Sequence, residues 1–213
     1  MSKDENTEAS AVIGVIGGTI TKNADGDTPG ESPSTPFGDA SASKQNIEIG
    51  QSNVLYMARH GRHHSIAPHD INYRANLWAF SEASVSAIVA MYAVGAIKEQ
   101  FAVGDIVIPD QIIDYTWGRA GSFGETLGLN HFDFSEPFTP LVRRQLQISG
   151  QESSRPVHTK GTYGCTQGPR LETSAEIERL RKDGCDLVGM TAMPEAALAR
   201  AVSYTHLTLP TKA

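Results

Sequence analysis

The sequence has few cysteines, no long apolar run and fewer basic than acidic residues, and each shortage excludes a class of protein. Only Cys165 and Cys185 occur in 213 residues, which excludes a disulfide-rich scaffold and favours a reducing compartment such as the cytoplasm. No stretch approaches the roughly 18 apolar residues of a membrane-spanning helix. The 18 Lys and Arg against 24 Asp and Glu give a net charge of −6, which argues against binding to nucleic acid or to a membrane surface.

Enough apolar residues remain for a folded core. Hydrophobic residues make up 39% of the chain, too many for a wholly disordered protein, and the length fits one domain of roughly 150–200 residues. The opening residues are polar and acidic, so we expect residues 1–10 to form a disordered tail and not a secretory signal. We expect residues 11–200 to form the folded domain.

Short β-rich runs alternate with helical patterns along the chain. We predict an α/β fold, a single domain whose mixed, mostly parallel sheet is flanked by helices. Residues 21–46 are rich in Gly, Pro, Ser, Asp and Thr and predict a long loop. The expected strands are 11–16, 53–57, 86–93, 106–109, 161–165 and 186–190, and the expected helices are 68–80, 141–148, 174–183 and 194–201.

Two predicted strands end in residues suited to an anion. Gly17-Gly18-Thr19 follows the first strand and offers backbone N–H groups beside a hydroxyl, although an ordinary tight turn explains it equally well. Arg59 and His60 follow the second strand, and a guanidinium fork there suits phosphate oxygens. Because ligands bind outside the carboxyl ends of parallel strands, the two motifs predict one site for a small dianion. The alternative is a surface Arg and a packed His.

Four histidines, His60, His63, His64 and His69, lie within ten residues. Their spacing matches no standard zinc pattern, and Asp70 is the nearby acid. We therefore predict no metal site, with a metal-dependent hydrolase as an alternative that metal analysis would test.

Two further strand-to-helix junctions carry candidate ligand-binding residues. Glu172 precedes a helix that Thr173 caps, so its carboxylate either interacts with the helix dipole or accepts a hydrogen bond from a ligand ring, with Leu171 as an apolar wall. Met190 and Thr191 follow the last predicted strand, where Met190 belongs either to the core or to the floor of a pocket.

Taken together, these motifs resemble the methylthioadenosine phosphorylase branch of the purine nucleoside phosphorylases. The order and approximate spacing of the matching strings hold over residues 12–200, and the bacterial S-methyl-5′-thioinosine phosphorylases and 6-oxopurine enzymes are the most similar members. The strings are GVIGGT (14–19), ARHGRHH (58–64), NYRANLWA (72–79), GDIVIPDQIIDYT (104–116), HFDFSEPF (131–138), TQGPRLET (166–173) and GMTAMPEAALAR (189–200).

The resemblance implies a pentosyltransferase that cleaves purine nucleosides with inorganic phosphate as co-substrate and without a metal or organic cofactor. It also implies a homo-oligomer, usually a trimer, with a hexamer as the alternative. It also implies roles for individual residues. Phosphate would bind at Gly18, Thr19, Arg59, His60, Ala93 and Thr191; ribose and base would contact Met190, Leu171 and Glu172; and His131 would reach a neighbouring subunit.

Glu172 bears on the choice of base. A carboxylate accepts a hydrogen bond from the N1–H of a 6-oxopurine, whereas N1 of adenine presents a lone pair to it. We therefore expect methylthioinosine or another 6-oxopurine nucleoside as substrate, with methylthioadenosine specificity as the alternative.

The chain departs from the family pattern at three places. Ile20 replaces the usual glycine after Gly-Gly-Thr, and Tyr92 stands where a small polar residue is expected. After Arg200 the resemblance stops, so we expect residues 201–213 to be an unrelated or non-native tail and the domain to be incomplete. Two alternatives therefore stay open, a catalytically inert fragment and a nucleosidase that uses water in place of phosphate.

Overall fold

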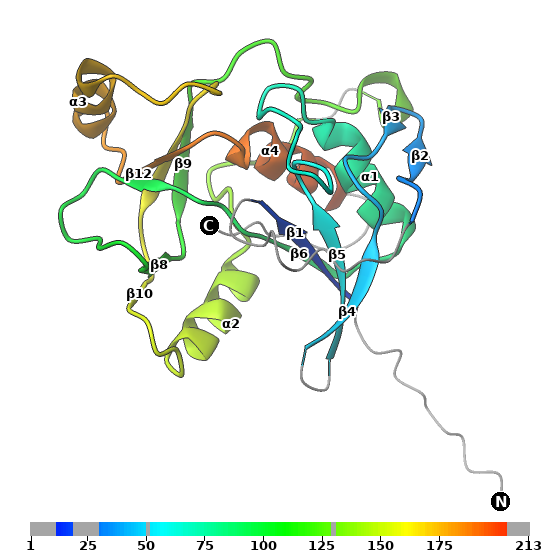
Figure 1. Ribbon diagram of the computed structural model, residues 1–213, viewed down its shortest axis with the longest axis horizontal. Coiled ribbons are helices and arrows are strands. Elements are labelled where there is room, and N and C mark those ends of the chain that lie inside the picture. The colour runs from blue at the N-terminus through cyan, green and yellow to red at the C-terminus, as the bar shows by residue number, and fades with distance from the viewer. Residues whose placement is uncertain (1–11, 19–29, 50–51, 129–130, 204–213) are drawn as a thin grey trace, which may run out of the picture.

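A four-stranded sheet built around β1 forms one half of the fold (Figure 1). The computed structural model describes residues 12–18, 30–49, 52–128 and 131–203. The strand order is β4-β5-β1-β6; β1 is parallel to β5 and β6, whereas β4 is antiparallel to β5. The bounds are β1 Ile13–Gly17, β4 Gln45–Ile49, β5 Ser52–Ala58 and β6 Ala87–Ala90.

A second four-stranded sheet has the order β7-β12-β11-β9. Its central strand β11 is parallel to β12 and β9, and the edge strand β7 is antiparallel to β12. The fold is therefore the predicted mixed, mostly parallel α/β type. The bounds are β7 Gly95–Ala96, β9 Gln111–Asp114, β11 Thr162–Cys165 and β12 Leu187–Gly189, and two short pairs join β2 Ser34–Thr35 to β3 Gly38–Asp39 and β8 Ile106–Val107 to β10 Val157–His158.

Helices α1 and α4 pack against each other and share the main core with the first sheet (Figure 1). Leu77 and Phe80 of α1, Leu198 of α4 and Ile16 of β1 are fully buried in this core. Among the described residues, no helix is long and apolar enough to cross a membrane. The helices are α1 Tyr73–Glu82, α2 Pro140–Gly150, α3 Ser174–Lys182 and α4 Ala192–Ser203, with a short 3-10 turn η2 at Gly124–Thr126.

The local signals for α3 act as the sequence predicts. The Thr173 side chain accepts a hydrogen bond from the Glu176 N–H, and the Glu176 carboxylate accepts one from the Thr173 N–H. Gly184 adopts φ +93° just after the helix, a conformation that a side chain would disfavour.

Several predicted element boundaries differ from the structure. The strand predicted at 86–93 is shorter, as β6 Ala87–Ala90, and the strand predicted at 106–109 is β8 Ile106–Val107. Helix α1 begins at Tyr73 and not at residue 68, because the Asn72 side chain caps it by accepting from the Ala75 N–H. The predicted loop 21–46 contains β2, β3 and the start of β4 in its described part, residues 30–46. The sequence of β4 has no long apolar run and therefore gave no strand signal. β4 is the edge strand of its sheet and pairs with β5 alone.

Gly14 in the middle of β1 is a packing glycine. A Cβ atom built on Gly14 would lie 2.8 Å from the Phe80 ring of α1 and 3.3 Å from the Ile88 side chain of β6. Helix and sheet approach this closely because Gly14 has no side chain.

We expect Gly14→Ala to lower the free energy of unfolding by about 1–3 kcal/mol, because the core must shift to admit a methyl group. Urea denaturation measures this change. Gly121→Ala is the control, since nothing lies within 4 Å of a Cβ at Gly121, and its effect should stay within about 0.5 kcal/mol. Equal effects of the two substitutions would contradict the packing role of Gly14.

Candidate functional site

A cavity of about 580 Å³ opens beside the carboxyl ends of four strands. Gly18 follows β1, Arg59 follows β5, Ala93 lies just beyond β6, and Met190 follows β12; all four residues line the cavity. Parallel strands bring their carboxyl ends to one edge of a sheet, so residues far apart in the sequence meet there.

The structure brings most of the predicted site residues to this cavity. Thr19, together with the unusual Ile20, lies outside the described residues. His131 is exposed and is absent from the cavity wall. The predicted residues that line the cavity are Gly18, Arg59, His60, Ala93, Leu171, Glu172, Met190 and Thr191.

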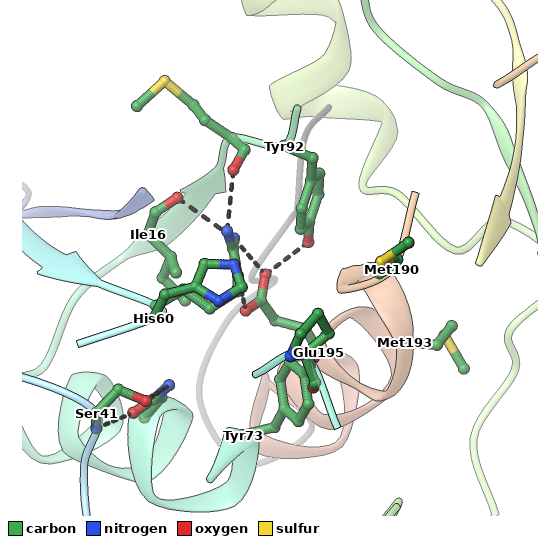
Figure 2. A network of polar contacts seen from close by, with 12 residues as sticks. Ile16, Ser41, His60, Tyr73, Tyr92, Met190, Met193 and Glu195 are labelled. Carbon is green, nitrogen blue, oxygen red and sulfur yellow. Dashed lines mark hydrogen bonds and ion pairs between the residues drawn. The ribbon is translucent and has the colours of Figure 1, made fainter. Parts of the chain in front are cut away.

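Arg59 is the most constrained of these residues, and Figure 2 labels its partner Glu195 with the neighbouring Tyr92 and His60. Its side chain is 1% exposed, and its Nε and Nη2 donate to the two carboxylate oxygens of Glu195 at 2.7 and 2.8 Å. Nη1 donates to the Met91 carbonyl at 3.0 Å, and Nη2 also reaches the Ile16 carbonyl at 3.4 Å. The guanidinium fork is thus directed at a buried carboxylate of α4 rather than at the cavity.

Electrostatics explains why this pair can be buried. Burial by itself lowers the pKa of Arg59, but the charge and hydrogen bonds of Glu195 outweigh burial and raise that pKa above its ordinary value. An ion pair without water is stable only when further hydrogen bonds satisfy both groups, and the two carbonyls complete the shell of Arg59.

Tyr92 supplies a further hydrogen bond to Glu195. Its hydroxyl donates to the carboxylate at 2.6 Å, and the Arg59 guanidinium lies 4.5 Å from the centre of the Tyr92 ring. Burial, together with the Glu195 charge, raises the pKa of Tyr92 well above its ordinary value, so the hydroxyl keeps its proton. The unusual residue of the sequence is therefore part of the buried charge network.

His60 presents one ring nitrogen to the chain and leaves the other edge toward the Gly18 turn. Nδ1 lies 2.8 Å from the Ile66 carbonyl, so Nδ1 carries the proton and donates. Burial lowers the pKa of His60, and the positive charge of Arg59 lowers it further. The neutral ring then has its lone pair on Nε2.

Only two of the four clustered histidines of the sequence line the cavity. The rings of His60 and His64 lie 4.5 Å apart between centres, and both line the cavity, whereas His63 and His69 do not line it. Within the described ranges, no three His, Cys, Asp or Glu side chains gather closely enough to hold a metal ion.

Gly18 leaves room for the Arg59 side chain. A Cβ atom on Gly18 would lie 2.9 Å from Nη1 of Arg59 and 3.8 Å from the His60 ring. Because Gly18 has no side chain, the backbone after β1 can lie close to Arg59 and His60. Nη1 of Arg59 therefore lies beside this turn.

Glu172 also lines this cavity. Its carboxylate accepts a hydrogen bond from the Thr166 hydroxyl, and it also borders a second cavity of about 350 Å³. Leu171 beside it is 80% exposed, and Thr191 is buried. The same cavity wall thus contains the strand-end residues Gly18, Arg59 and His60 and a carboxylate next to an apolar side chain.

Sequence reasoning did not assign Glu195 a role. The signal was present, because an arginine directly after a strand predicted to be buried needs a counter-charge. Glu195 lies in the first turn of a helix that follows another strand end, but no local pattern links it to Arg59, 136 residues earlier.

Comparison with known proteins shows the family to which this chain belongs. The sequence pattern of the family described as "Phosphorylase superfamily" matches residues 11–209. A probable S-methyl-5′-thioinosine phosphorylase of Xylella fastidiosa is 51% identical over 159 residues, which cover 72% of this chain and 64% of that protein. The chain therefore matches slightly less than two thirds of the length of that relative.

Other relatives widen the range of named activities. A 6-oxopurine nucleoside phosphorylase of Pyrococcus furiosus is 43% identical over 186 residues, covering 84% of this chain and 69% of the relative. The methylthioadenosine phosphorylase structure of Schistosoma mansoni superimposes with a TM-score of 0.84 at 29% identity, covering 94% of this chain and 79% of that one.

We expect Glu195→Gln to lower the free energy of unfolding by about 3 kcal/mol or more, because it leaves the buried Arg59 charge without a counter-charge. Urea denaturation at neutral pH measures the loss. The matched control is Glu178→Gln, which removes the partner of Arg181 in an exposed pair and should change stability by less than about 1 kcal/mol. Similar losses in both variants would contradict the account of the buried pair.

Proposed function

Because the chain belongs to the phosphorylase superfamily, we propose that it cleaves the N-glycosidic bond of S-methyl-5′-thioinosine or another 6-oxopurine nucleoside with inorganic phosphate. It would be a pentosyltransferase that needs no metal or organic cofactor. The observation that carries the proposal is that one cavity is lined by Gly18 and His60, which we propose for phosphate, and by Glu172, which we propose for the base.

The reaction needs positioning more than a covalent nucleophile. A phosphate oxygen forms a bond to C1′ as the bond from C1′ to the purine nitrogen breaks, and the proton of hydrogen phosphate ends on the departing base. The products are free 6-oxopurine and (5-methylthio)ribose 1-phosphate. Because the ribosyl group becomes cationic on the way, holding phosphate against C1′ supplies much of the rate.

The phosphate subsite would use neutral and backbone donors as well as charge. Arg59 is bound to Glu195, so its fork does not meet phosphate directly; its Nη1 lies beside Gly18 and contributes from there. His60 faces the same turn and would accept the proton of hydrogen phosphate on Nε2, and Thr191 and Ala93 also line the wall. The family resemblance assigns Thr19, which lies outside the described residues, to the same subsite.

Ribose and base would lie in the same cavity. Met190 would pack under the ribose, and Leu171 would cover one face of the purine. The Glu172 carboxylate, whose Oε1 already accepts a hydrogen bond from the Thr166 hydroxyl, would accept the N1–H of the base.

The active assembly would be a homo-oligomer, most simply a trimer. His131 is exposed and stands apart from the cavity wall of its own chain. A neighbouring subunit in such an assembly would receive it near the 5′ group of the nucleoside.

We expect release of hypoxanthine from S-methyl-5′-thioinosine and from inosine to require phosphate. The measurement is base release by this chain with and without phosphate, with methylthioadenosine as a parallel substrate. Release without phosphate would identify a nucleosidase, and faster release of adenine would identify methylthioadenosine specificity. No release from folded protein would support the inert-fragment alternative; each of these three results contradicts the proposal.

We expect Glu172→Gln to shift the preference from 6-oxopurine toward 6-aminopurine nucleosides by about 10-fold to 100-fold in kcat/KM, because an amide N–H can donate to N1 of adenine whereas a carboxylate cannot. Steady-state rates on both nucleosides measure the ratio. Glu176→Gln is the control, since Glu176 lies in the same segment but pairs with Arg170. An unchanged ratio in Glu172→Gln would contradict the contact with the base.

A further inference from the structure

Arg119, in the segment after β9, has an unusual set of partners: all of them are neutral. Its Nη1 donates to the carbonyl oxygens of Met190, at 2.8 Å, and of Met193. Its Nη2 donates to the carbonyl of Gln167 at 2.8 Å and approaches that of Thr166 at 3.5 Å. One guanidinium group thus holds backbone carbonyls from two separate segments.

These two segments carry proposed ligand contacts. Residues 166–172 leave β11 and lead to Leu171 and Glu172, and residues 190–193 leave β12 and contain Met190 and Thr191. The start of each segment is also bonded to the strand end beside it: the Thr166 N–H donates to the Gly189 carbonyl at 2.8 Å, and the Met193 N–H lies 3.2 Å from the Cys165 sulfur.

Arg119 is also linked, through Tyr73, to the cavity-lining residue Pro68. Nη1 of Arg119 lies 3.3 Å from the Tyr73 hydroxyl, which donates to the carbonyl of Pro68, a cavity-lining residue. The guanidinium carbon also lies 5.6 Å from the centre of the Tyr73 ring. Figure 2 shows Tyr73 below Glu195, with Met190 and Met193 to one side.

The planar guanidinium is well suited to this task. It presents five N–H donors in a fixed geometry, so it can bridge carbonyls that no single ammonium group would reach together. The Arg119 Nε has no hydrogen-bond partner among the described residues, so the contacts come from the two terminal nitrogens alone.

We infer that Arg119 is a positioning residue that sets the distance between the base-binding segment 166–172 and the ribose- and phosphate-binding segment 190–193. The inference rests on the proposed function for what those segments bind, but not for the positioning itself. Arg119 acts through backbone carbonyls and makes no contact with substrate.

The first test compares hydrogen exchange in the full chain and in Arg119→Met. We expect the Thr166 and Met193 amides to exchange at least about 10-fold faster in the variant, because the carbonyls around them lose their common donor. Arg119→Lys keeps the charge without the fork, so at least one of the two amides should also exchange faster. If Arg119→Met does not fold, Arg119→Lys carries the test by itself.

Arg143→Met is the matched control. Arg143 likewise bridges two carbonyls, those of Pro109 and Thr159, at 2.8 and 2.7 Å, but neither residue lines the cavity. Its loss should leave the Thr166 and Met193 amides unchanged. Equal effects of the Arg119 and Arg143 variants on these amides, or no effect of either Arg119 variant, would overturn the inference.

The second test is kinetic. We expect Arg119→Lys to lower kcat by about 10-fold to 100-fold with a smaller change in the KM for phosphate, because displaced groups misalign the reacting atoms more than they weaken binding. Lowered kcat in Arg143→Met to the same extent would overturn the inference. Absence of phosphorolysis in the unmodified chain would overturn the proposed function alone, since the exchange experiment still decides the role of Arg119.

Discussion

The buried ion pair between Arg59 and Glu195 is the interaction on which the site depends. It joins the end of β5 in the first sheet to the first turn of α4, which follows β12 of the second sheet. Because a lone charge in this position would be costly, separating the two elements would leave a buried charge unpaired. Tyr92, beyond β6, adds its hydroxyl to the same carboxylate, so three strand ends share one set of charges.

This arrangement changes the meaning of the arginine in the anion-binding motif. The Arg59 Nε and Nη2 already donate to the two carboxylate oxygens of Glu195, so they are not a free pair of donors for a ligand. Arg59 then acts on the site through its position and its positive charge. The negative charge of a bound anion must then be met by several modest groups, among them the backbone near Gly18 and Thr191. A neutral His60 whose Nδ1–H donates to the Ile66 carbonyl has its lone pair on Nε2, so it can accept the proton of hydrogen phosphate but cannot donate to a phosphate oxygen.

Much of the fold could be predicted from local sequence. The capping box at Thr173 and Glu176, the stop at Gly184 and the apolar runs of β1 and β6 are signals whose physical cause lies within a few residues. The errors came where tertiary contacts decide. Asn72 delays the start of α1, and β4 is polar because it lies at the edge of its sheet. The candidate site residues were found through strand-end motifs, whereas Glu195 and Arg119 lack any local signature.

The sequence by itself determined the alternation of strands and helices, the family resemblance and the residue types available at the strand ends. Hydrophobic periodicity and turn residues act over short distances, so they can be read from neighbours in the chain. Only the tertiary structure decided that Arg59 faces Glu195, that Tyr92 joins this pair and that Arg119 bridges two segments. The hydrogen bonds of these contacts join residues that are 47 to 136 positions apart, and their free energy exists only when the packed sheets exclude water from the charges.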